Sequence, residues 1–270
     1  MTASKVRLHV EDSGGTGRPV VLIHGWPLSA ASWKAQVPVL RDAGYRVIAY
    51  DRRGFGRSDK PTDGYEYDTL AADLAGIIDE LDLKDVSLVG FSMGGGEVAR
   101  YISTYGQDKL HSVVFASAVP PYLLKTEDNP DGPLTKEKAD EMAAGLGKDR
   151  EAFFENFSKE FFSANGQLKV TEAQRQDAIA LAHQSDQTAA LGCQKAFGTN
   201  DFREDLKKIT VPTLVIHGDA DGTVPFEGSG ARTHKAVANS ELVVLKDAPH
   251  GCNVSNADEF NLALLNFLKK

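Results

Sequence analysis

Short apolar runs alternate with helical patterns along most of the chain. The runs are continuously apolar, which is typical of strands buried on both faces of a sheet. Helix-forming stretches separate them, as in a mostly parallel, doubly wound α/β sheet with right-handed crossovers. The predicted strands are Val20–Ile23, Arg46–Tyr50, Val86–Gly90, Ser112–Ala116, Thr213–Ile216 and Leu242–Leu245, and the predicted helices lie near Trp33–Asp42, Leu70–Leu83, Glu97–Tyr105, Ser229–Ala238 and Glu259–Leu268.

The alternation stops between about residues 119 and 205, where helix formers predominate without a strand. We predict that this part is a helical cap, inserted into a single domain of residues 1–270 and lying over the strand ends. Its phenylalanines recur at three- and four-residue spacings, which amphipathic packing explains for most of them. A cap also lines any pocket beneath it, so we expect Phe157 and Phe161 to face that pocket. The predicted cap helices are Lys136–Ala144, Glu151–Phe162 and Glu172–His183.

Composition limits what the chain can bind. A chain of 270 residues with 41% hydrophobic content can bury a substantial core in one α/β domain. Its formal net charge of −8, from 38 acidic against 30 basic residues, offers no basic face for nucleic acid or anionic lipid. No apolar stretch reaches membrane-spanning length, and the first residues lack the apolar core of a signal peptide. We therefore expect a cytoplasmic protein without nucleic-acid or membrane partners, and we leave open whether it forms a homo-oligomer.

No motif for a metal or nucleotide cofactor is present. The sequence lacks a His-Glu-x-x-His pair, a phosphate-cradling glycine loop and a G-x-G-x-x-G after a strand. Its two cysteines, Cys193 and Cys252, form neither a disulfide framework nor a metal-binding spacing, so we expect both to be reduced packing residues. We predict a protein that uses no metal and no other cofactor.

Candidate chemistry begins at residues 86–96, Val-Ser-Leu-Val-Gly-Phe-Ser-Met-Gly-Gly-Gly. In a G-x-S-x-G turn the serine hydroxyl is exposed at the carboxyl edge of a sheet, and the flanking glycines relieve crowding that a Cβ would cause. Gly90, Ser92 and Gly94 fit this pattern, so we predict that Ser92 is a nucleophile. The same pentapeptide occurs in ordinary turns, so the prediction depends on the partners that the chain supplies.

A serine hydroxyl needs a base to take its proton, and the base needs a carboxylate to hold it in one tautomer. The loops after two later strands supply the carboxylate and the base. One strand ends in a loop with two acids, Asp219 and Asp221, and the next is followed by His250. The order serine, acid, histidine differs from that in chymotrypsin and subtilisin. Asp219 could instead stabilise its own turn, and the residues alone leave the choice of acid open.

Position along the chain selects His250 among the histidines. His24 and His217 each end an apolar strand, where neighbouring backbone groups are expected to satisfy the ring. The remaining four lie among polar or small residues and are expected at the surface; they are His9, His111, His183 and His234.

Negative charge developing on a tetrahedral oxygen needs preorganised donors, usually backbone amides. The amide of Met93, directly after the predicted nucleophile, is one candidate. The other is the amide of Trp26, in the loop after the first predicted core strand. Pro27 has no N–H and restricts Trp26 to extended conformations, so we expect it to set the direction of the Trp26 amide and carbonyl.

Several segments in this order resemble the α/β-hydrolase family, and more closely its bacterial subgroup of cofactor-free, non-haem haloperoxidases and aryl esterases, also called perhydrolases. The resemblance covers nearly the whole chain. The segments are His24-Gly25-Trp26-Pro27, Asp51-Arg52-Arg53-Gly54-Phe55-Gly56-Arg57-Ser58, Gly90-Phe91-Ser92-Met93-Gly94-Gly95-Gly96-Glu97, His217-Gly218-Asp219-Ala220-Asp221 and Ala248-Pro249-His250-Gly251.

The resemblance implies an α/β-hydrolase fold and assigns a role to each matched residue. Ser92 would be the nucleophile, Asp221 the acid and His250 the base, with the Trp26 and Met93 amides as the oxyanion hole. Thr223 stands where the family often has a bulky aliphatic residue, which alters the expected shape of the pocket. The substrate pocket would be lined by Pro27, Phe157, Phe161, Phe197 and Thr223.

The resemblance also implies two activities at one triad. One is hydrolysis of small aryl or alkyl carboxylic esters through an acyl-enzyme, with water as the acceptor. The other is formation of a peracid from a carboxylic acid and hydrogen peroxide, after which the released peracid oxidises halide without a halide site.

Other functions remain open at this stage. Epoxide hydrolases and haloalkane dehalogenases share the fold but carry an aspartate at the elbow, so Ser92 disfavours an alkyl-enzyme. Lactonase, lactamase or other acyl-transfer chemistry is compatible with the same triad. From a different class, the chain could be a ligand-binding receptor with a vestigial hydrolase site. Turnover of p-nitrophenyl acetate separates the enzyme from the receptor.

Overall fold

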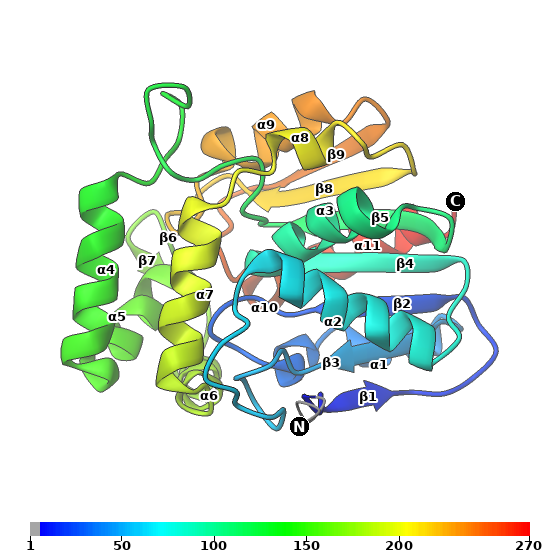
Figure 1. The fold of residues 1–270 in the computed structure, drawn as a ribbon, viewed down its shortest axis with the longest axis horizontal. Coiled ribbons are helices and arrows are strands. Elements are labelled where there is room, and N and C mark those ends of the chain that lie inside the picture. Colours follow the sequence, from blue (N-terminus) through cyan, green and yellow to red (C-terminus); the bar gives the residue numbers. More distant parts are fainter. Residues whose placement is uncertain (1–5) are drawn as a thin grey trace, which may run out of the picture.

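A twisted seven-stranded sheet forms the centre of the computed structural model, which describes residues 6–270 (Figure 1). The strand order is β1-β3-β2-β4-β5-β8-β9. All neighbouring pairs are parallel except β1 with β3, as expected for strands joined by helical crossovers. The strands are β1 (Val10–Asp12), β2 (Pro19–Ile23), β3 (Arg46–Tyr50), β4 (Val86–Phe91), β5 (Leu110–Ala116), β8 (Thr213–Gly218) and β9 (Ser240–Leu245).

Helices cover both faces of this sheet, which explains why its central strands are continuously apolar. Val21 and Ile23 of β2 belong to one hydrophobic core, whereas Val20 and Leu22 belong to the core on the opposite face. Figure 1 shows α2 and α3 in front of the sheet and α11 behind it. The helices of this part are α1 (Val37–Asp42), α2 (Tyr67–Glu80), α3 (Met93–Tyr105), α8 (Arg203–Leu206), α9 (Gly230–Ala236), α10 (Cys252–Ser255) and α11 (Ala257–Leu268).

A group of helices between β5 and β8 stands at one end of the sheet (Figure 1). Side-chain caps define where they begin: Thr135, Asp149 and Asp186 each accept a hydrogen bond from a first-turn amide, and Thr171 forms a full capping box with Gln174. A short two-stranded ribbon, β6 (Ser163–Ala164) with β7 (Gln167–Leu168), interrupts the group. The helices are α4 (Lys136–Lys148), α5 (Arg150–Phe162), α6 (Glu172–His183) and α7 (Gln187–Thr199), and we refer to them as the cap helices.

The sequence prediction differs from the structure at several elements. The predicted helix Trp33–Asp42 is a 3-10 turn, Ala30–Trp33, followed by a separate helix α1 with Pro38 in its first turn, where a missing N–H costs nothing. Helix α7 and the ribbon β6–β7 were not predicted.

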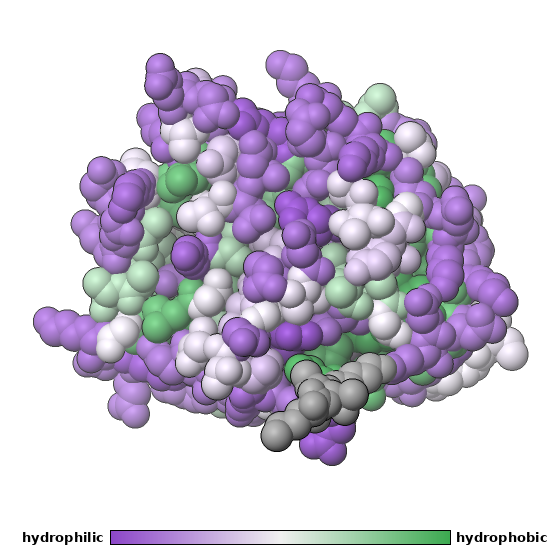
Figure 2. Space-filling view, in the orientation of Figure 1, coloured by the Kyte–Doolittle hydropathy of each residue, from purple (hydrophilic) through white to green (hydrophobic). Residues whose placement is uncertain are grey.

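The face shown in Figure 2 is covered mainly by hydrophilic residues, with hydrophobic ones in small separate groups. Among the described residues, the large apolar side chains with substantial exposure lie on separate elements: Tyr105, Leu168, Val244 and Leu262. Within residues 6–270, no helix has both the length and the apolar character needed to cross a membrane.

Candidate active site

Ser92 lies at a sharp turn between β4 and α3. Its φ of +53° is in the left-handed region, which is strained for a residue with a side chain. The chain can turn this sharply because the residues two positions before and after Ser92 are glycines. A Cβ on Gly90 would lie 2.6 Å from the carbonyl oxygen of Gly94, and one on Gly94 would lie 2.6 Å from that of Ile23. Both glycines of the pentapeptide are therefore required by close packing.

The structure brings Ser92, His250 and Asp221 into one hydrogen-bonded chain. His250 Nε2 lies 2.9 Å from Ser92 Oγ, and His250 Nδ1 lies 2.7 Å from Asp221 Oδ2. Ser92 follows β4, Asp221 follows β8 and His250 follows β9, so all three stand at the carboxyl edge of the sheet. With Nδ1–H donating to the carboxylate, the Nε2 lone pair faces the serine hydroxyl, which is the arrangement needed to take its proton.

Asp221 is a buried but stable anion. Its Oδ1 accepts hydrogen bonds from the amides of Thr223 at 2.9 Å and Val224 at 2.8 Å. Burial alone would raise the pKa of the carboxyl, but the charge of His250 and hydrogen bonds from His217 and His250 outweigh burial and hold that pKa at about 2. The group is therefore a carboxylate at neutral pH.

Asp219 has a different role from the one its sequence position suggested. Its side chain is exposed and accepts a hydrogen bond of 2.7 Å from the amide of Asp247, beyond the end of β9. The carboxylate thus bridges two loops instead of closing its own turn, and it makes no contact with His250 among the described hydrogen bonds.

The other strand-end histidines are buried and bonded to nearby backbone, as predicted. His24 Nδ1 lies 2.8 Å from the carbonyl oxygen of Gly25, and His24 Nε2 accepts a 2.9 Å hydrogen bond from the amide of Arg52. His217 Nε2 lies 2.8 Å from the carbonyl oxygen of Val224, but it also lies 3.2 Å from Asp221 Oδ2. Sequence reasoning missed this second contact because it depends on how the loop after β8 folds back.

The two amides predicted for the oxyanion hole flank the serine. Met93 begins α3 directly after Ser92, and Trp26 lies in the loop after β2, next to β4 in the sheet. Within residues 6–270, neither amide donates a hydrogen bond to another group of the protein. The indole of Trp26 donates to the carbonyl oxygen of Ala190 on α7 at 3.0 Å, which fixes the loop against the cap helices.

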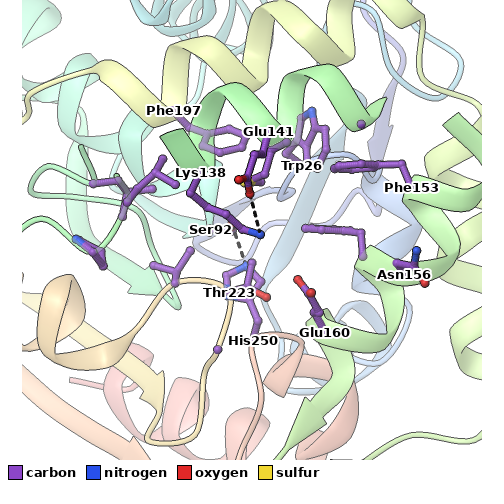
Figure 3. Close-up of a pocket in the computed structure, with 18 of the residues that line it drawn as sticks. Trp26, Ser92, Lys138, Glu141, Phe153, Asn156, Glu160, Phe197, Thr223 and His250 are labelled. Carbon is purple, nitrogen blue, oxygen red and sulfur yellow. Dashed lines mark hydrogen bonds and ion pairs between the residues drawn. The ribbon is translucent and has the colours of Figure 1, made fainter. Parts of the chain in front are cut away.

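A cavity of about 770 Å³ opens over the triad, between the sheet edge and the cap helices (Figure 3). Ser92 and His250, both buried, are among the residues that line it. Of the predicted pocket residues, Phe157, Phe197 and Thr223 line it, together with the apolar side chains Val119, Leu123, Leu134, Met142, Phe153 and Val224.

Two predicted pocket residues do not line this cavity. Phe161 packs edge-on against the His250 ring, with 4.9 Å between ring centroids. Together with Pro27 it borders a separate, much smaller cavity behind Phe157. The helical spacing placed Phe157 and Phe161 on one face of α5, but only Phe157 reaches the larger cavity.

Charged and polar side chains from α4 and α5 line the outer part of the cavity. Figure 3 shows Lys138 extending over the site towards Thr223, with Glu141 and Glu160 nearby. Lys138 Nζ lies 3.7 Å from Glu141 Oε2. Sequence analysis missed these residues because they belong to no motif and resemble any solvated helix face.

Cys252 is close to the triad but is not a second nucleophile. It is fully buried, its Sγ lies 3.4 Å from Ser117 Oγ, and burial raises the pKa of its thiol to about 12. Cys193 on α7 is likewise buried, and burial raises its thiol pKa to about 12. Because the thiolate is the reactive form, both cysteines are packing residues, as predicted.

Similar proteins share both the sequence and the fold. Residues 18–257 match the family model described as alpha/beta hydrolase fold. The chain is 45% identical to a putative non-heme chloroperoxidase of Synechocystis sp., over 99% of this chain and 96% of that protein. It is 38% identical to a bifunctional esterase/perhydrolase of Acinetobacter calcoaceticus, over 99% and 98% of the two chains. The crystal structure of a bromoperoxidase from Bacillus anthracis has a TM-score of 0.96 and 54% identity, covering 98% of this chain and 96% of that one.

Proposed function

The chain belongs to the alpha/beta-hydrolase family, and on that premise we propose that it is a serine esterase that also forms peracids from carboxylic acids and hydrogen peroxide. The observation that supports this most is the chain of hydrogen bonds from Ser92 Oγ through His250 to Asp221, whose first two members line a large, mainly apolar cavity. The similarity to a bifunctional esterase/perhydrolase supports the pairing of the two activities.

We propose that acylation begins when Ser92 Oγ attacks the ester carbonyl carbon. The serine proton passes to His250 Nε2, and the carbonyl π electrons move to the oxygen, which the Trp26 and Met93 amides stabilise. Asp221 stabilises the imidazolium through Nδ1–H. When the tetrahedral intermediate collapses, His250 returns the proton to the departing alcohol, and an acyl-serine ester remains. A carboxylic acid acylates Ser92 in the same way, and its hydroxyl group, protonated by His250, leaves as water.

The acyl-enzyme then reacts with either of two acceptors. Water, deprotonated by His250, releases the carboxylic acid and regenerates Ser92. Hydrogen peroxide attacks in the same way and releases a peracid, RCO₃H. Outside the protein, the peracid transfers one oxygen to a halide ion, giving a carboxylate and a hypohalous acid, so this oxidation needs no cofactor and no halide site. The apolar cavity favours substrates with an aryl or alkyl group.

Replacement of Ser92 by alanine tests the proposal. We expect Ser92→Ala to lower kcat for p-nitrophenyl acetate by roughly 10⁴-fold or more, because only binding and the oxyanion donors remain. Peracid formation from acetate and peroxide should fall in parallel, since both reactions pass through the same acyl-serine. A phosphonate inhibitor should label the wild-type protein at Ser92 and leave the variant unlabelled. Near-wild-type turnover of either substrate by a folded variant would contradict the proposed role of Ser92.

A further inference from the structure

Two histidines contact the same carboxylate oxygen. Asp221 Oδ2 lies 2.7 Å from His250 Nδ1 and 3.2 Å from His217 Nε2. Both rings are almost completely buried, at 1% and 0% exposure. The second histidine comes from β8 itself, which is held in the sheet by β5 and β9 on its two sides. His217 has no role in the proposed mechanism, although it contacts the acid of the triad.

The surroundings of His217 determine which nitrogen carries its proton. Nδ1 has no hydrogen-bond partner in residues 6–270 and faces Gly230, where even an added Cβ would lie 2.6 Å from it. Nε2 faces two acceptors, the carbonyl oxygen of Val224 at 2.8 Å and Asp221 Oδ2. A proton on Nδ1 would leave a buried donor unsatisfied and turn the Nε2 lone pair towards two oxygens. The neutral ring therefore carries its proton on Nε2, which donates to the carbonyl oxygen of Val224 and also lies 3.2 Å from Asp221 Oδ2.

We propose that His217 is a positioning residue for the triad: its Nε2–H, held on β8 by the hydrogen bond to the Val224 carbonyl, also faces Asp221 Oδ2 at 3.2 Å and keeps that oxygen directed at His250 Nδ1. The loop amides of Thr223 and Val224 hold the other oxygen, so both carboxylate oxygens are held. This inference rests on the proposed function, because it concerns the acid of that mechanism.

The contact also tunes how strongly Asp221 stabilises a protonated His250. A neutral N–H donor draws negative charge from Oδ2, so the carboxylate stabilises the imidazolium less than it would without that donor. The titratable groups near Asp221 are His250, His217 and Cys252. The thiol of Cys252 is uncharged at neutral pH. Replacement of His217 should therefore change how strongly Asp221 stabilises the protonated form of His250.

The test compares His217→Leu, which removes the donor, with His217→Gln, whose side-chain amide keeps one. We expect His217→Leu to lower kcat for p-nitrophenyl acetate by about ten- to a hundredfold, the effect of one hydrogen bond to a charged group, with KM little changed. The acid limb of its kcat/KM profile should move to higher pH, because a less neutralised carboxylate favours protonated His250. His217→Gln should recover most of kcat and return the acid limb of the kcat/KM profile towards the wild-type pH.

A matched control separates positioning from packing. Ser229→Ala removes a 2.6 Å hydrogen bond to the carbonyl oxygen of Pro225 in the same loop without touching Asp221. It should leave the acid limb unchanged. The proposal is overturned if His217→Leu keeps the wild-type kcat and pH profile, or if it loses kcat without any shift of the acid limb.

A measurement on the wild-type protein covers the case in which the leucine variant does not fold. Nitrogen-15 spectra of labelled histidines should show His217 as the Nε2–H tautomer between pH 6 and 8, and an Nδ1–H tautomer would overturn the proposal. Failure of the proposed function would look different. In that case the wild-type protein would neither hydrolyse p-nitrophenyl acetate nor be labelled at Ser92, whatever the tautomer of His217.

Discussion

Two carboxylates on one loop, Asp219 and Asp221, have opposite surroundings. Asp221 is buried and has donors on both oxygens, whereas Asp219 is exposed and holds the amide of Asp247. A buried carboxylate with fixed donors keeps one orientation, and an orienting group for His250 needs that property. The difference between the two residues can therefore be tested by removing each charge in turn.

We predict that Asp221→Asn lowers kcat for ester hydrolysis on the order of 10⁴-fold, because an amide at this position would favour the wrong tautomer of His250. Asp219→Asn should change kcat less than about threefold, since the Asn side chain keeps an oxygen that accepts from the Asp247 amide and the exposed Asp219 side chain has no hydrogen bond to Ser92, His250 or Asp221 within residues 6–270. Steady-state kinetics gives kcat for both variants, and circular dichroism shows whether each variant is folded. The reverse ranking would move the orienting role to Asp219.

Residue identity and order were enough to predict that Ser92 and His250 lie together, because the glycine spacing and the strand-end position each leave few alternatives. They were not enough for Phe161 and Pro27, which border a small cavity beside the main one. The direction of an aromatic side chain on a cap helix depends on the tilt of that helix against the sheet. That tilt is set by tertiary packing and leaves no periodic signal in the sequence.

At the level of elements, a buried ion pair connects the two segments that carry the proposed oxyanion donors. Arg52, after β3, contacts Glu97 on α3, with 2.6 Å between Nε and Oε1. The same guanidinium donates to the carbonyl oxygen of His24 at 2.6 Å, two residues before Trp26. Tyr50 donates to the second oxygen of Glu97 at 2.8 Å. The pair therefore ties the loop of Trp26 to the helix that begins at Met93.

We predict that Glu97→Gln lowers the free energy of unfolding by about 3 kcal/mol or more, because it leaves the guanidinium of Arg52 buried without its counter-charge. The double variant Arg52→Met/Glu97→Leu should lose less than Glu97→Gln alone, since it buries no unpaired charge. Urea unfolding measures both, and Asp42→Asn, which breaks an exposed pair with Arg41, should change stability by less than about 1 kcal/mol. A double variant that is as unstable as Glu97→Gln, or less stable, would rule out this account.

The start of α3 shows a helix boundary that intrinsic helix propensity does not predict. The sequence predicted a helix near Glu97–Tyr105, yet α3 starts four residues earlier, at Met93, and includes three glycines of weak helix propensity. Packing requires those glycines: a Cβ on Gly95 would lie 2.4 Å from the Cβ of Ala118, and one on Gly96 would lie 2.5 Å from the ring of Tyr67. Close approach of α3 to its neighbours thus overrides the weak helix propensity, an effect that the local sequence does not reveal.

On the scale of the whole molecule, one aromatic side chain joins the sheet edge to the cap helices. The indole of Trp26 makes edge-on contacts with phenylalanines of both α5 and α7, and its N–H is held by α7. The residue whose amide faces the proposed oxyanion is thus anchored in the same cluster that forms the wall of the cavity. Alternation of strands and helices predicted a sheet covered by helices on both faces, but the Trp26–Ala190 hydrogen bond spans more than 160 residues of chain and depends on how the cap helices pack.

The pH dependence of stability should be dominated below neutral pH by a buried histidine that cannot take up a proton. His24 is fully buried, accepts the Arg52 amide at Nε2 and has the Arg52 guanidinium beside it. Burial, and then the positive charge of Arg52, lower the pKa of His24 well below its usual 6.5. In the unfolded chain the same ring binds a proton near pH 6.5, so unfolding takes up a proton at lower pH.

Because the unfolded state binds more protons, stability rises with pH and is lost as pH falls below about 6.5. We predict that His24 contributes a slope to the free energy of unfolding that rises from about 1 to about 1.3 kcal/mol per pH unit as the pH falls from 6 to 5. His24→Gln keeps an acceptor but loses the packing of the imidazole, so its free energy of unfolding should be lower than that of the wild type at pH 8. Because the glutamine side chain cannot be protonated, the difference between the two free energies should shrink below pH 6 by the slope given above. Urea unfolding of both proteins from pH 5 to 8 measures the gap. Parallel stability curves would mean that His24 takes up its proton in the native state as readily as in the unfolded chain.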